Sequence, residues 1–378
     1  MNLWLVNVFK TGSLNAIVMV MKTISDISPK AERKATIRDV AKAARVSIAT
    51  VSRALNAPGR VTPAVCRRVA EVVERLGYVA HGPARALASR QTSAVGAIVP
   101  TLDNAIFASC INALQIRLDD HGYVLLVAST EYDSARELRE LRALLERGID
   151  GLMLVGMAHE AAVRALIAAS HVPTVTTWTS DATAPWPTIG FDNVAAMEKI
   201  VDHLWTLGHR RFGMIAGITV GNDRAARRVE GVRRALDRRA GAGAGLDVVE
   251  RPYDIREGRN AFRALMASTR APTAIVGGND VLALGGLFEA QALGLRVPAD
   301  VSITGFDDLN LVSHVTPGLT TIRIPAVDMG RRAADHLVES LRGRPGLPAT
   351  ELDVELILRG STGPAPEGLT ARSRRRSR

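Results

Sequence analysis

Hydrophobic residues recur at helical spacing in two short segments between positions 36 and 56. In the first segment they fall on one helical face, at Ile37, Val40, Ala41 and Ala44. Thr36 precedes Asp39 by three residues, which is the spacing of a capping box. In the second segment Ser47 can cap the helix, and the inward positions are Val51, Ala54 and Leu55. The pattern predicts two short helices joined by a tight turn, a helix-turn-helix.

A third helix is indicated by the segment that follows. Thr62 and Pro63 match an N-cap followed by proline at the first helical position, and Gly77 is placed to end the helix. Between them lies an apolar series at Val65, Val69, Val72, Val73 and Leu76. The three helices together predict a compact DNA-binding headpiece over residues 35–80.

The second helix of such a headpiece presents its start and outer face to the major groove of DNA. Here Arg53 can grip a guanine, Thr50 or Ser52 can bind a phosphate, and Ile48 and Ala49 offer apolar contacts. The DNA-contacting residues expected in the headpiece are Thr36, Arg38, Ser47, Ile48, Ala49, Thr50, Ser52, Arg53 and Asn56.

From Ser93 onward the apolar pattern changes to short continuous runs separated by amphipathic segments. The runs predict buried strands at residues 95–99, 123–128, 151–155, 173–177, 212–216, 273–276 and 301–304. The segments predict helices near residues 106–121, 134–147, 160–170, 192–207, 224–238, 256–268 and 280–293. Strands alternating with helices predict parallel sheets covered on both faces. The expected fold class is therefore α/β, and a break near residues 190–193 favours a two-lobed domain over residues 93–362.

The chain resembles the LacI/GalR transcriptional repressors. The resemblance rests on residues 36–56, on Val61-Thr62, on LGY at 76–78 and on ARAL at 84–87, and the order of elements continues to match to about residue 360. It implies a periplasmic-binding-protein-like pair of lobes, with parallel sheets and a small-molecule effector held in the cleft. It also implies a homodimer that reads a nearly palindromic operator in double-stranded DNA.

Residues 81–92 resemble the hinge helix of this family, which forms on DNA and inserts a leucine into the minor groove. Leu87 is the matching leucine, and Ala84 and Arg85 are expected to contact DNA beside it. An ordinary flexible linker is the alternative interpretation.

Arg45 departs from the family pattern, which generally has glycine in the turn between the first two helices. If the turn requires a positive φ, a non-glycine residue there costs roughly 1 kcal/mol. Our hypothesis is that Arg45 compensates by touching a DNA phosphate.

Polar side chains follow several of the predicted strands, where ligands bind in parallel α/β sheets. The resemblance implies that Arg228, Asn279 and Asp307 contact the effector. Asn104, Phe107 and Trp178, at the ends of two further strands, are candidates for hydrogen bonding and for stacking on a sugar ring. Charged and aromatic groups together favour a sugar or sugar acid.

Each of these residues also has a structural interpretation. Asn279 and Asp307 can cap the following helices, Arg228 can be one more surface arginine, and Trp178 can serve packing alone. The family often has an acidic residue near Trp178, where this chain has Thr179. That departure leaves the particular effector open.

The basic charge lies at the ends of the chain. Residues 1–91 contain 15 Lys or Arg and 5 Asp or Glu, whereas residues 92–363 contain 28 and 32. A basic headpiece attracts phosphates, so DNA affinity should fall steeply with salt. The two cysteines, Cys66 and Cys110, suit neither a disulfide framework nor a zinc site, and a reducing cytoplasm, on the nucleoid, is the expected location.

No nucleotide-binding, metalloprotease or serine-nucleophile motif occurs in the sequence, so no cofactor or metal and no enzymatic activity is expected. Two alternatives remain open. One is a cytoplasmic small-molecule sensor that does not read DNA, and the other is a sugar-modifying enzyme.

The two ends of the chain lie outside this scheme. Residues 1–34 are expected to be a disordered extension or a wrongly assigned start, with Met19 or Met21 as the true first residue. The apolar runs in this segment are too short and interrupted to span a membrane, and a signal peptide is the competing interpretation. Residues 363–378, with five arginines, are expected to form a basic disordered tail.

Overall fold

The computed structural model describes residues 35–56, 58–78, 91–239 and 244–366. The chain divides into two compact units, Met1–Arg85 and Ala86–Arg378. The expected hinge residues Ala84, Arg85 and Leu87 lie outside the described residues, as do the extension over residues 1–34 and residues 367–378 of the tail.

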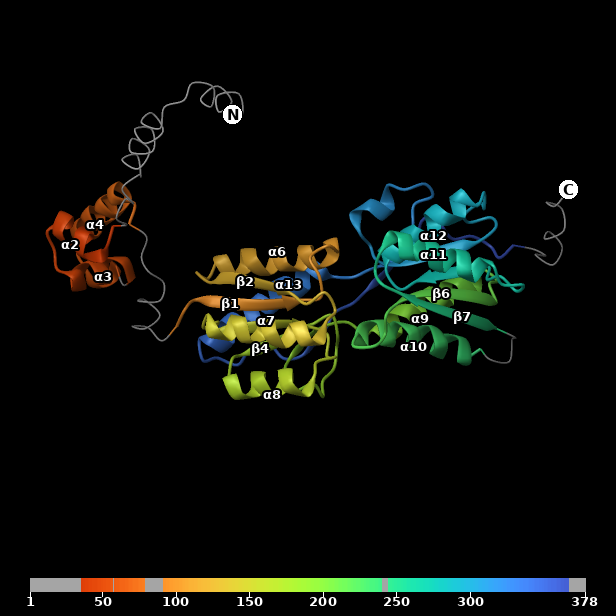
Figure 1. The fold of residues 1–378 in the computed structure, drawn as a ribbon, viewed down its shortest axis with the longest axis horizontal. Helices are drawn as coiled ribbons and strands as arrows, with labels where there is room; N and C mark the ends of the chain where they lie inside the picture. The colour runs from red at the N-terminus through yellow and green to blue at the C-terminus, as the bar shows by residue number, and fades with distance from the viewer. Residues whose placement is uncertain (1–34, 57, 79–90, 240–243, 367–378) are drawn as a thin grey trace, which may run out of the picture. The chain divides into compact units, whose positions relative to one another are not determined.

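Three α-helices form the described part of the first unit (Figure 1). They are α2 (Ile37–Ala44), α3 (Ile48–Asn56) and α4 (Pro63–Leu76), with a 3-10 turn, η2, at Pro58–Arg60. The capping box is present, because Thr36 Oγ1 accepts a hydrogen bond from the Asp39 N–H and the Asp39 carboxylate accepts one from the Thr36 N–H. Gly77 ends α4 in the left-handed conformation, at φ 57°. The three helices predicted from the sequence are confirmed.

The headpiece core consists of a few side chains from the three helices, together with Tyr78, which follows α4: Val40, Ala41, Ala44, Val51, Val69, Val72 and Tyr78. Two residues expected in this core are exposed instead. Leu55 is 37% exposed and Leu76 is 36% exposed. Both lie in the last turn of their helices, so a core of this size does not reach far enough to enclose them.

The second unit contains two six-stranded sheets (Figure 1). The N-terminal lobe has strand order β11-β5-β4-β3-β1-β2, and its strands are β1 (Ala94–Val99), β2 (Val124–Ser129), β3 (Gly151–Val155), β4 (Thr174–Thr177), β5 (Thr188–Gly190) and β11 (Thr350–Glu351). The C-terminal lobe has order β12-β10-β9-β8-β6-β7, and its strands are β6 (Arg211–Gly217), β7 (Gly245–Arg251), β8 (Ala274–Gly277), β9 (Ser302–Asp307), β10 (Thr320–Arg323) and β12 (Glu355–Ile357). All pairs are parallel except β10 with β12.

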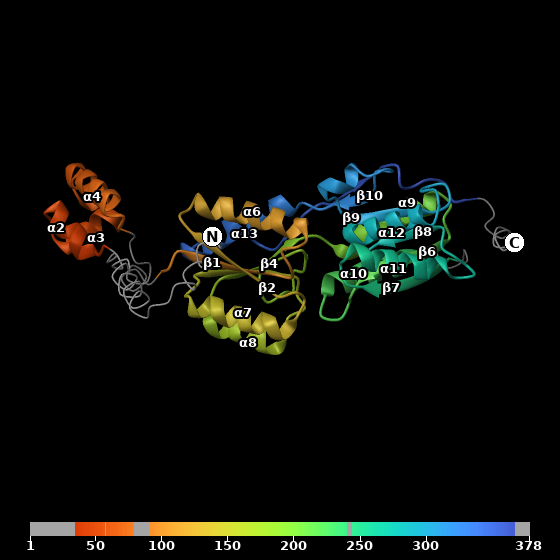
Figure 2. The ribbon, with the colours of Figure 1, turned by 45° about the horizontal axis from the view of Figure 1, so that its top comes forward.

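Helices cover both faces of each sheet (Figure 2). In the N-terminal lobe α6 (Ala105–Asp119) and α13 (Ala326–Leu341) lie on one face, and α7 (Ser134–Glu146) and α8 (Ala161–Ser170) on the other. In the C-terminal lobe α9 (Asn193–Thr206) packs against α10 (Asp223–Asp237), and α11 (Ile255–Met266) against α12 (Asp280–Ala292). A short 3-10 helix, η4 (Asn310–Ser313), follows β9.

The chain crosses between the lobes three times: after β5, after β10 and after β11. The seven strands and seven helices predicted from residue 93 onward are confirmed, as is the lobe boundary near residue 190. The predictions did not include β5, β7, β10, β11, β12 or α13. As a result of the later crossings, α13 packs against α6, more than 200 residues earlier in the chain.

Residues 363–366, which were expected to begin the disordered tail, pack on the C-terminal lobe instead. The Gly363 carbonyl lies 3.0 Å from Nε2 of the buried His209, and the Ala365 N–H donates to the Leu207 carbonyl. Among the described helices, none has both the length and the apolar character that a membrane crossing requires.

Candidate DNA-reading and effector sites

The N-terminal turn and outer face of α3 are open to solvent. Ile48 is 45% exposed, although it is a large apolar residue, and Ala49 and Arg53 are also exposed. Val51, on the opposite face, is fully buried in the headpiece core. The helix therefore presents the residues that were expected to meet base edges.

The polar residues at the start of α3 are partly engaged with one another. Ser47 Oγ accepts a hydrogen bond from the Thr50 N–H at 3.1 Å and lies 2.8 Å from Thr50 Oγ1, so Ser47 caps the helix as predicted. Thr36 takes part in the capping box of α2, and Arg38 is exposed in its first turn. Thr36 and Ser47 thus have structural roles besides any contact with DNA.

Arg45 adopts the left-handed conformation in the turn between α2 and α3, at φ 53° and ψ 47°. This is the conformation for which glycine is the least strained residue. The turn is thus geometrically like one built on glycine, and Arg45 occupies it with an exposed side chain.

A small cavity lies between the two lobes, and its wall includes all six candidate effector residues: Asn104, Phe107 and Trp178 from the N-terminal lobe, and Arg228, Asn279 and Asp307 from the C-terminal lobe. We call it the inner cavity. Its free volume of about 20 Å³ is room for roughly one water molecule. A ligand of sugar size therefore requires the lobes to separate or side chains to move.

Arg228 is buried in this wall rather than lying on the surface. Its Nε donates to Asn193 Oδ1 at 2.9 Å, its Nη1 donates to the Gly278 carbonyl at 2.7 Å, and the guanidinium lies over the Phe306 ring at 3.7 Å. Nη2 lies 4.0 Å from the Asp307 carboxylate and makes no hydrogen bond within the described residues. Donors on Nη2 are therefore available to a ligand.

Asn104 and Asn279 are both helix caps, a role that the sequence analysis proposed for Asn279 but not for Asn104. The Asn104 side-chain oxygen accepts from the Ile106 N–H, and the Asn279 oxygen accepts from the Leu282 N–H. In the described part of the chain, neither side-chain amide nitrogen has a hydrogen-bond partner. Capping thus uses the oxygen of each amide and leaves its two N–H donors for the cavity.

Asp307 does not cap a helix. It ends β9 at φ 119° and is 4% exposed, and in the described residues its carboxylate accepts no hydrogen bond. Burial raises its pKa to about 7, while Arg228 and Arg224 limit the rise. Near neutral pH, therefore, this carboxyl group exchanges readily between a hydrogen-bond donor and an acceptor.

Trp178 and Phe107 form an aromatic wall, with ring centroids 4.9 Å apart. Trp178 is 1% exposed and has a positive φ of 65°. Its carbonyl accepts a hydrogen bond from Asn193 Nδ2 at 3.0 Å, and Asn193 in turn binds Arg228. A chain of hydrogen bonds thus links the aromatic wall of one lobe to the arginine of the other.

The first turn of α10 holds the lobes together directly. The Asp223 carboxylate accepts from the Met157 N–H at 3.0 Å, and Arg224 Nη1 donates to the Val155 carbonyl at 3.1 Å. Gly156 lies between Val155 and Met157 and has no side chain; a Cβ there would collide with Arg224 Nη1. Arg224 of α10 therefore both contacts the N-terminal lobe and lines the inner cavity.

Four further residues line the inner cavity and were not among the sequence candidates: Ile106, Tyr132, Arg224 and Tyr253. The rings of Tyr132 and Tyr253 meet across the lobes, with centroids 5.6 Å apart. Tyr132 follows β2 directly, so the strand-end rule that identified Asn104 could have found it. Tyr253 and Arg224 reach the cavity only through tertiary packing.

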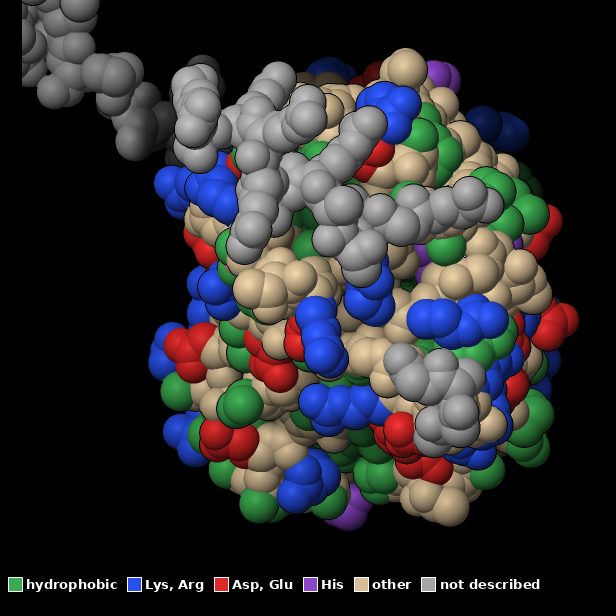
Figure 3. All heavy atoms as spheres, turned by 90° about the vertical axis from the view of Figure 1, so that its right-hand side faces the viewer, with side chains coloured by type: hydrophobic (Ala, Val, Ile, Leu, Met, Phe, Trp, Pro, Cys, Tyr) green, Lys and Arg blue, Asp and Glu red, His purple; other side chains and the backbone are tan. Residues whose placement is uncertain are grey.

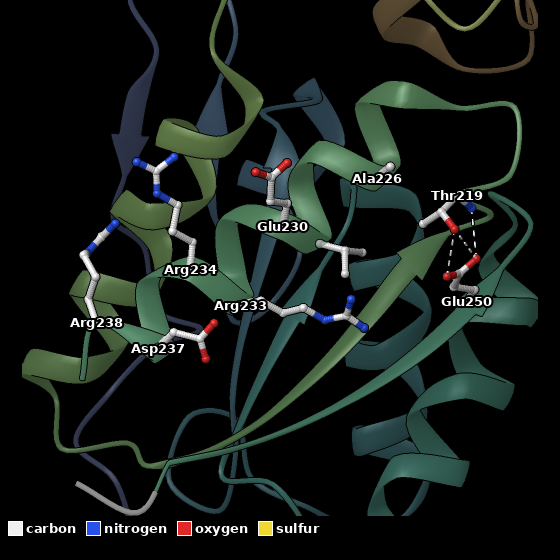
Figure 4. A pocket seen from close by; sticks show the side chains of 9 residues that line it. Thr219, Ala226, Glu230, Arg233, Arg234, Asp237, Arg238 and Glu250 are labelled. Carbon is white, nitrogen blue, oxygen red and sulfur yellow. Dashed lines mark hydrogen bonds between the residues drawn. The ribbon is translucent and has the colours of Figure 1, made fainter. Parts of the chain in front are cut away.

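A larger hollow, of about 680 Å³, lies on the outer side of α10 (Figure 4). Its residues, among them Thr219, Arg233 and Glu250, all belong to the C-terminal lobe. The Glu250 carboxylate is already bound to Thr219. Because this hollow touches one lobe only, a ligand in it would not sense the angle between the lobes.

The surface of the C-terminal lobe carries no single sign of charge on the face drawn in Figure 3, where Lys and Arg side chains alternate with Asp and Glu. The part of this face that is not drawn in grey therefore lacks the uniform positive field that attracts a phosphate backbone. The contrast agrees with the excess of basic residues at positions 1–91.

Comparisons with known proteins agree with this architecture. Residues 36–81 match the family described as bacterial regulatory proteins, lacI family, and residues 201–362 match a periplasmic binding protein-like domain. The HTH-type transcriptional repressor CytR of Escherichia coli strain K12 is 32% identical over 344 residues, which cover 89% of this chain and 99% of the relative.

Solved structures of similar architecture include the lac repressor dimer bound to operator and the anti-inducer ONPF. That structure has a TM-score of 0.78 and 26% identity, and the match covers 88% of this chain and all of that one. The complex of the transcriptional regulator CelR with cellobiose has a TM-score of 0.64 and 26% identity, covering 86% of this chain and 99% of the other.

A helix-turn-helix headpiece followed by a two-lobed domain with a cavity between its lobes defines a DNA-binding transcriptional regulator that is switched by a small molecule. The chain belongs to the LacI family of bacterial regulatory proteins. Membership of this family favours a DNA-binding regulator over the first alternative interpretation of the sequence, a small-molecule sensor that does not read DNA. The family as a whole is one of transcriptional regulators and not of enzymes.

Proposed function

We propose that this protein is a cytoplasmic repressor that acts as a homodimer on a nearly palindromic operator, and that a sugar or sugar acid bound in the inner cavity changes its affinity for that operator. The regulated genes would then serve the use of that compound. A two-fold symmetric dimer suits a palindromic site, because each headpiece reads one half.

On the DNA side, we assign base contacts to the exposed first turn of α3. Arg53 reads a guanine in the major groove, and Ile48 and Ala49 make apolar contacts with base edges. Thr50 and Ser52 hold phosphates, and the remaining candidates Thr36, Arg38, Ser47 and Asn56 lie near the backbone of the operator. The proposed minor-groove contacts are Ala84, Arg85 and Leu87.

On the effector side, the chemistry of the inner cavity supports a molecule rich in hydroxyl or carboxylate groups. Donors are available on Asn104 Nδ2, Asn279 Nδ2 and Arg228 Nη2, and the Asp307 carboxyl can accept or donate. Phe107 and Trp178 offer an apolar face on which a sugar ring can pack. The cellobiose bound by CelR is a compound of this class.

One observation supports the proposed coupling between effector binding and the angle between the lobes. α10 supplies both the cavity residue Arg228 and the hydrogen bonds of Asp223 and Arg224 to the opposite lobe. A ligand that draws Arg228 toward the aromatic wall therefore acts on the helix that sets the lobe angle. Effector binding shifts the population of lobe arrangements to the extent that its affinity for them differs.

The test is a fluorescence anisotropy titration of the full chain against labelled DNA from the region flanking its own gene, with and without sugars and sugar acids. We expect salt-sensitive but sequence-specific binding, altered at least tenfold by one compound. The Asp307→Asn variant should keep DNA binding and lose the response. Specific binding that no sugar or sugar acid changes would refute the proposed effector class.

A further inference from the structure

One residue in the wall of the inner cavity is open to solvent. In the part of the chain that the structure describes, ten residues line this cavity, and eight of them are at most 9% exposed. Tyr253 is half-buried, whereas Tyr132 is 41% exposed. A molecule that enters while the lobes stay together must therefore displace Tyr132.

A larger pocket lies on the solvent side of Tyr132. It is lined mainly by residues that follow β2 and β3 and by Val220 and Gly221 of the C-terminal lobe, and its free volume is about 460 Å³. We call it the outer pocket. Val220 is 87% exposed, so the outer pocket opens to solvent. Tyr132 and Arg224 are the two residues that line both spaces, and they form the wall between them.

These two wall residues are held to different degrees. Arg224 is 8% exposed, and its Nη1 donates to the Val155 carbonyl at 3.1 Å. The Tyr132 side chain makes no hydrogen bond within the described residues, and its aromatic contact is with Tyr253, at a centroid distance of 5.6 Å. The wall is therefore fixed at Arg224 and free to move at Tyr132.

Tyr253 provides a fixed surface on the opposite lobe. Its ring packs directly on Gly217 of β6, where a Cβ would collide with the ring. Its hydroxyl accepts a hydrogen bond from Asn222 Nδ2 at 3.4 Å. Of the two tyrosines that meet across the lobes, Tyr132 is thus the one that can swing away.

Tyr132 lies in a strained turn whose ends are anchored. The Thr130 N–H donates to the Val99 carbonyl, and the Asp133 N–H donates to the Thr130 carbonyl, each at 3.0 Å. Between these anchors Glu131 and Tyr132 have φ values of 52° and 60°. Turns with two consecutive positive φ values favour glycine, asparagine and aspartate. Strain of this kind is maintained at functional sites, and here it holds the Tyr132 ring against the opposite lobe.

We propose that Tyr132 is a side-chain gate, and that small molecules enter and leave the inner cavity past it while the hydrogen bonds of α10 to the N-terminal lobe stay intact. This inference rests on the proposed function, because it takes the inner cavity to be the effector site. Exposed side chains change rotamer within nanoseconds, whereas lobes rearrange in microseconds to milliseconds. When Tyr132 swings out, the inner cavity becomes continuous with the outer pocket, which gives a ligand room to enter.

The test uses acrylamide, a small uncharged molecule that quenches tryptophan fluorescence on contact. Trp178 lines the inner cavity and is 1% exposed, so its quenching reports entry into the cavity. The chain has four tryptophans, and Trp4→Phe, Trp186→Phe and Trp205→Phe leave Trp178 alone. If that protein folds poorly, the difference between wild type and Trp178→Phe gives the same quantity. We expect measurable quenching, and a Trp178 that acrylamide does not quench would overturn the inference.

The Tyr132→Ala variant removes the gate. We expect it to raise the quenching constant of Trp178 at least threefold, because the inner cavity then stays open to the outer pocket. Tyr123→Ala is the matched control, since Tyr123 directly precedes β2, is partly buried in the same lobe and lines neither space. Equal increases in the two variants would mean that loosening of the lobe, and not the gate, admits acrylamide.

The Asp223→Ala variant tests the competing route, which is separation of the lobes. The Asp223 carboxylate accepts a hydrogen bond from the Met157 N–H at 3.0 Å, and its loss should raise the population of separated lobes about tenfold. If molecules pass Tyr132, the quenching constant of Trp178 stays within twofold of the parent protein. A tenfold rise would show that the lobes must separate, and would overturn the inference.

This experiment needs no effector, so its outcome is separate from that of the anisotropy titration. If no sugar or sugar acid acts there while acrylamide passes Tyr132, the proposed effector class is wrong and the gate remains. If a sugar acts but the quenching results go against Tyr132, the effector site remains and the gate is wrong.

Discussion

The headpiece and the two-lobed domain place their binding residues in opposite ways. In the headpiece the side chains proposed to read DNA project from α3 into solvent, and Ile48 is 45% exposed. In the domain the side chains proposed to bind the effector are buried, with Trp178 and Asn279 exposed by 1% and 2%. A large partner such as DNA can approach an exposed face, whereas a small ligand is bound tightly only if it is enclosed.

This difference has an energetic consequence. A residue that projects from α3 makes few contacts within the protein, so its loss should affect DNA binding alone. A residue of the inner cavity also satisfies buried partners in both lobes, so its loss should affect folding stability as well as binding. Measurements of folding stability and of binding on the same variants test whether the two kinds of residue differ in this way.

The largest effect is expected for Arg228→Ala. The change removes the hydrogen bonds to Asn193 and the Gly278 carbonyl and leaves Asp307 without its nearest cation. We expect the free energy of unfolding of the two-lobed domain to fall by about 3 kcal/mol or more. Urea denaturation followed by circular dichroism measures this.

The control for this variant is Arg227→Ala, one position earlier on α10. Arg227 is half-exposed and forms an ion pair with Glu230, so its loss should cost less than about 1 kcal/mol. Equal losses for the two variants would contradict the structural role given to Arg228.

A pH-dependent effect of a few kcal/mol at most is expected from Asp307. Burial raises its pKa in the folded protein to about 7, while in the unfolded chain the carboxyl titrates near its usual value of about 4. Between these values the folded state holds a proton that the unfolded state has lost. The stabilising contribution of the neutral carboxyl is therefore full below about pH 4 and is lost as the pH rises to 7.

The Asp307→Asn variant isolates this contribution, because asparagine is close in shape and does not titrate. We expect wild-type stability to fall relative to the variant as the pH is raised from 4 to 7. Chemical denaturation of both proteins across this range measures the difference. A difference that is independent of pH would show that Asp307 titrates normally in the folded protein.

A smaller effect, confined to DNA binding, is expected for Arg53→Ala. Loss of a guanine contact should weaken operator binding by about 1–3 kcal/mol and relax the preference at one base pair. The free energy of unfolding should remain within about 0.5 kcal/mol of wild type, since Arg53 is exposed.

Anisotropy titrations against the operator and against single-base variants of it measure the change. Arg75→Ala, an exposed arginine in the last turn of α4, controls for the loss of charge alone. If Arg53→Ala weakened all sequences evenly, Arg53 would bind a phosphate rather than a base.

The smallest effects are expected for Arg45→Gly, and they have opposite signs. Relief of the left-handed strain at φ 53° should stabilise the headpiece by roughly 1 kcal/mol. Loss of a phosphate contact should weaken DNA binding evenly across sequences and reduce the salt dependence by about one ion. Thermal denaturation and titrations at several salt concentrations measure the two effects.

An Arg45→Gly protein that gains stability and binds DNA as before would exclude the phosphate contact. A protein that loses both stability and affinity would show instead that the Arg45 side chain supports the turn itself.

Several features of this protein follow from its sequence because their causes are local. The capping box at Thr36 and Asp39 and the helix end at Gly77 depend on neighbouring residues only. Strand-end polar residues such as Asn104 and Asn279 could each be placed at the carboxyl-end edge of its own sheet, because parallel strands all end on the same side. Convergence of the six effector candidates on one cavity was thus expected in outline from the chain alone.

The remaining features depend on contacts between distant parts of the chain. β11 is two residues long and joins the N-terminal sheet beside β5, which lies about 160 residues earlier, so its own sequence has no distinctive period. Leu55 belongs to an apolar series but lies beyond the reach of a small core.

The helix-turn-helix, the alternation of strands and helices and the residues at the strand ends could all be predicted from the sequence. That Arg224 and Tyr253 join the inner cavity could be learned only from the packing of the two lobes. Hydrophobic periodicity and capping act over a few residues, whereas the wall of a cavity depends on which side chains from separate elements meet once the lobes have packed.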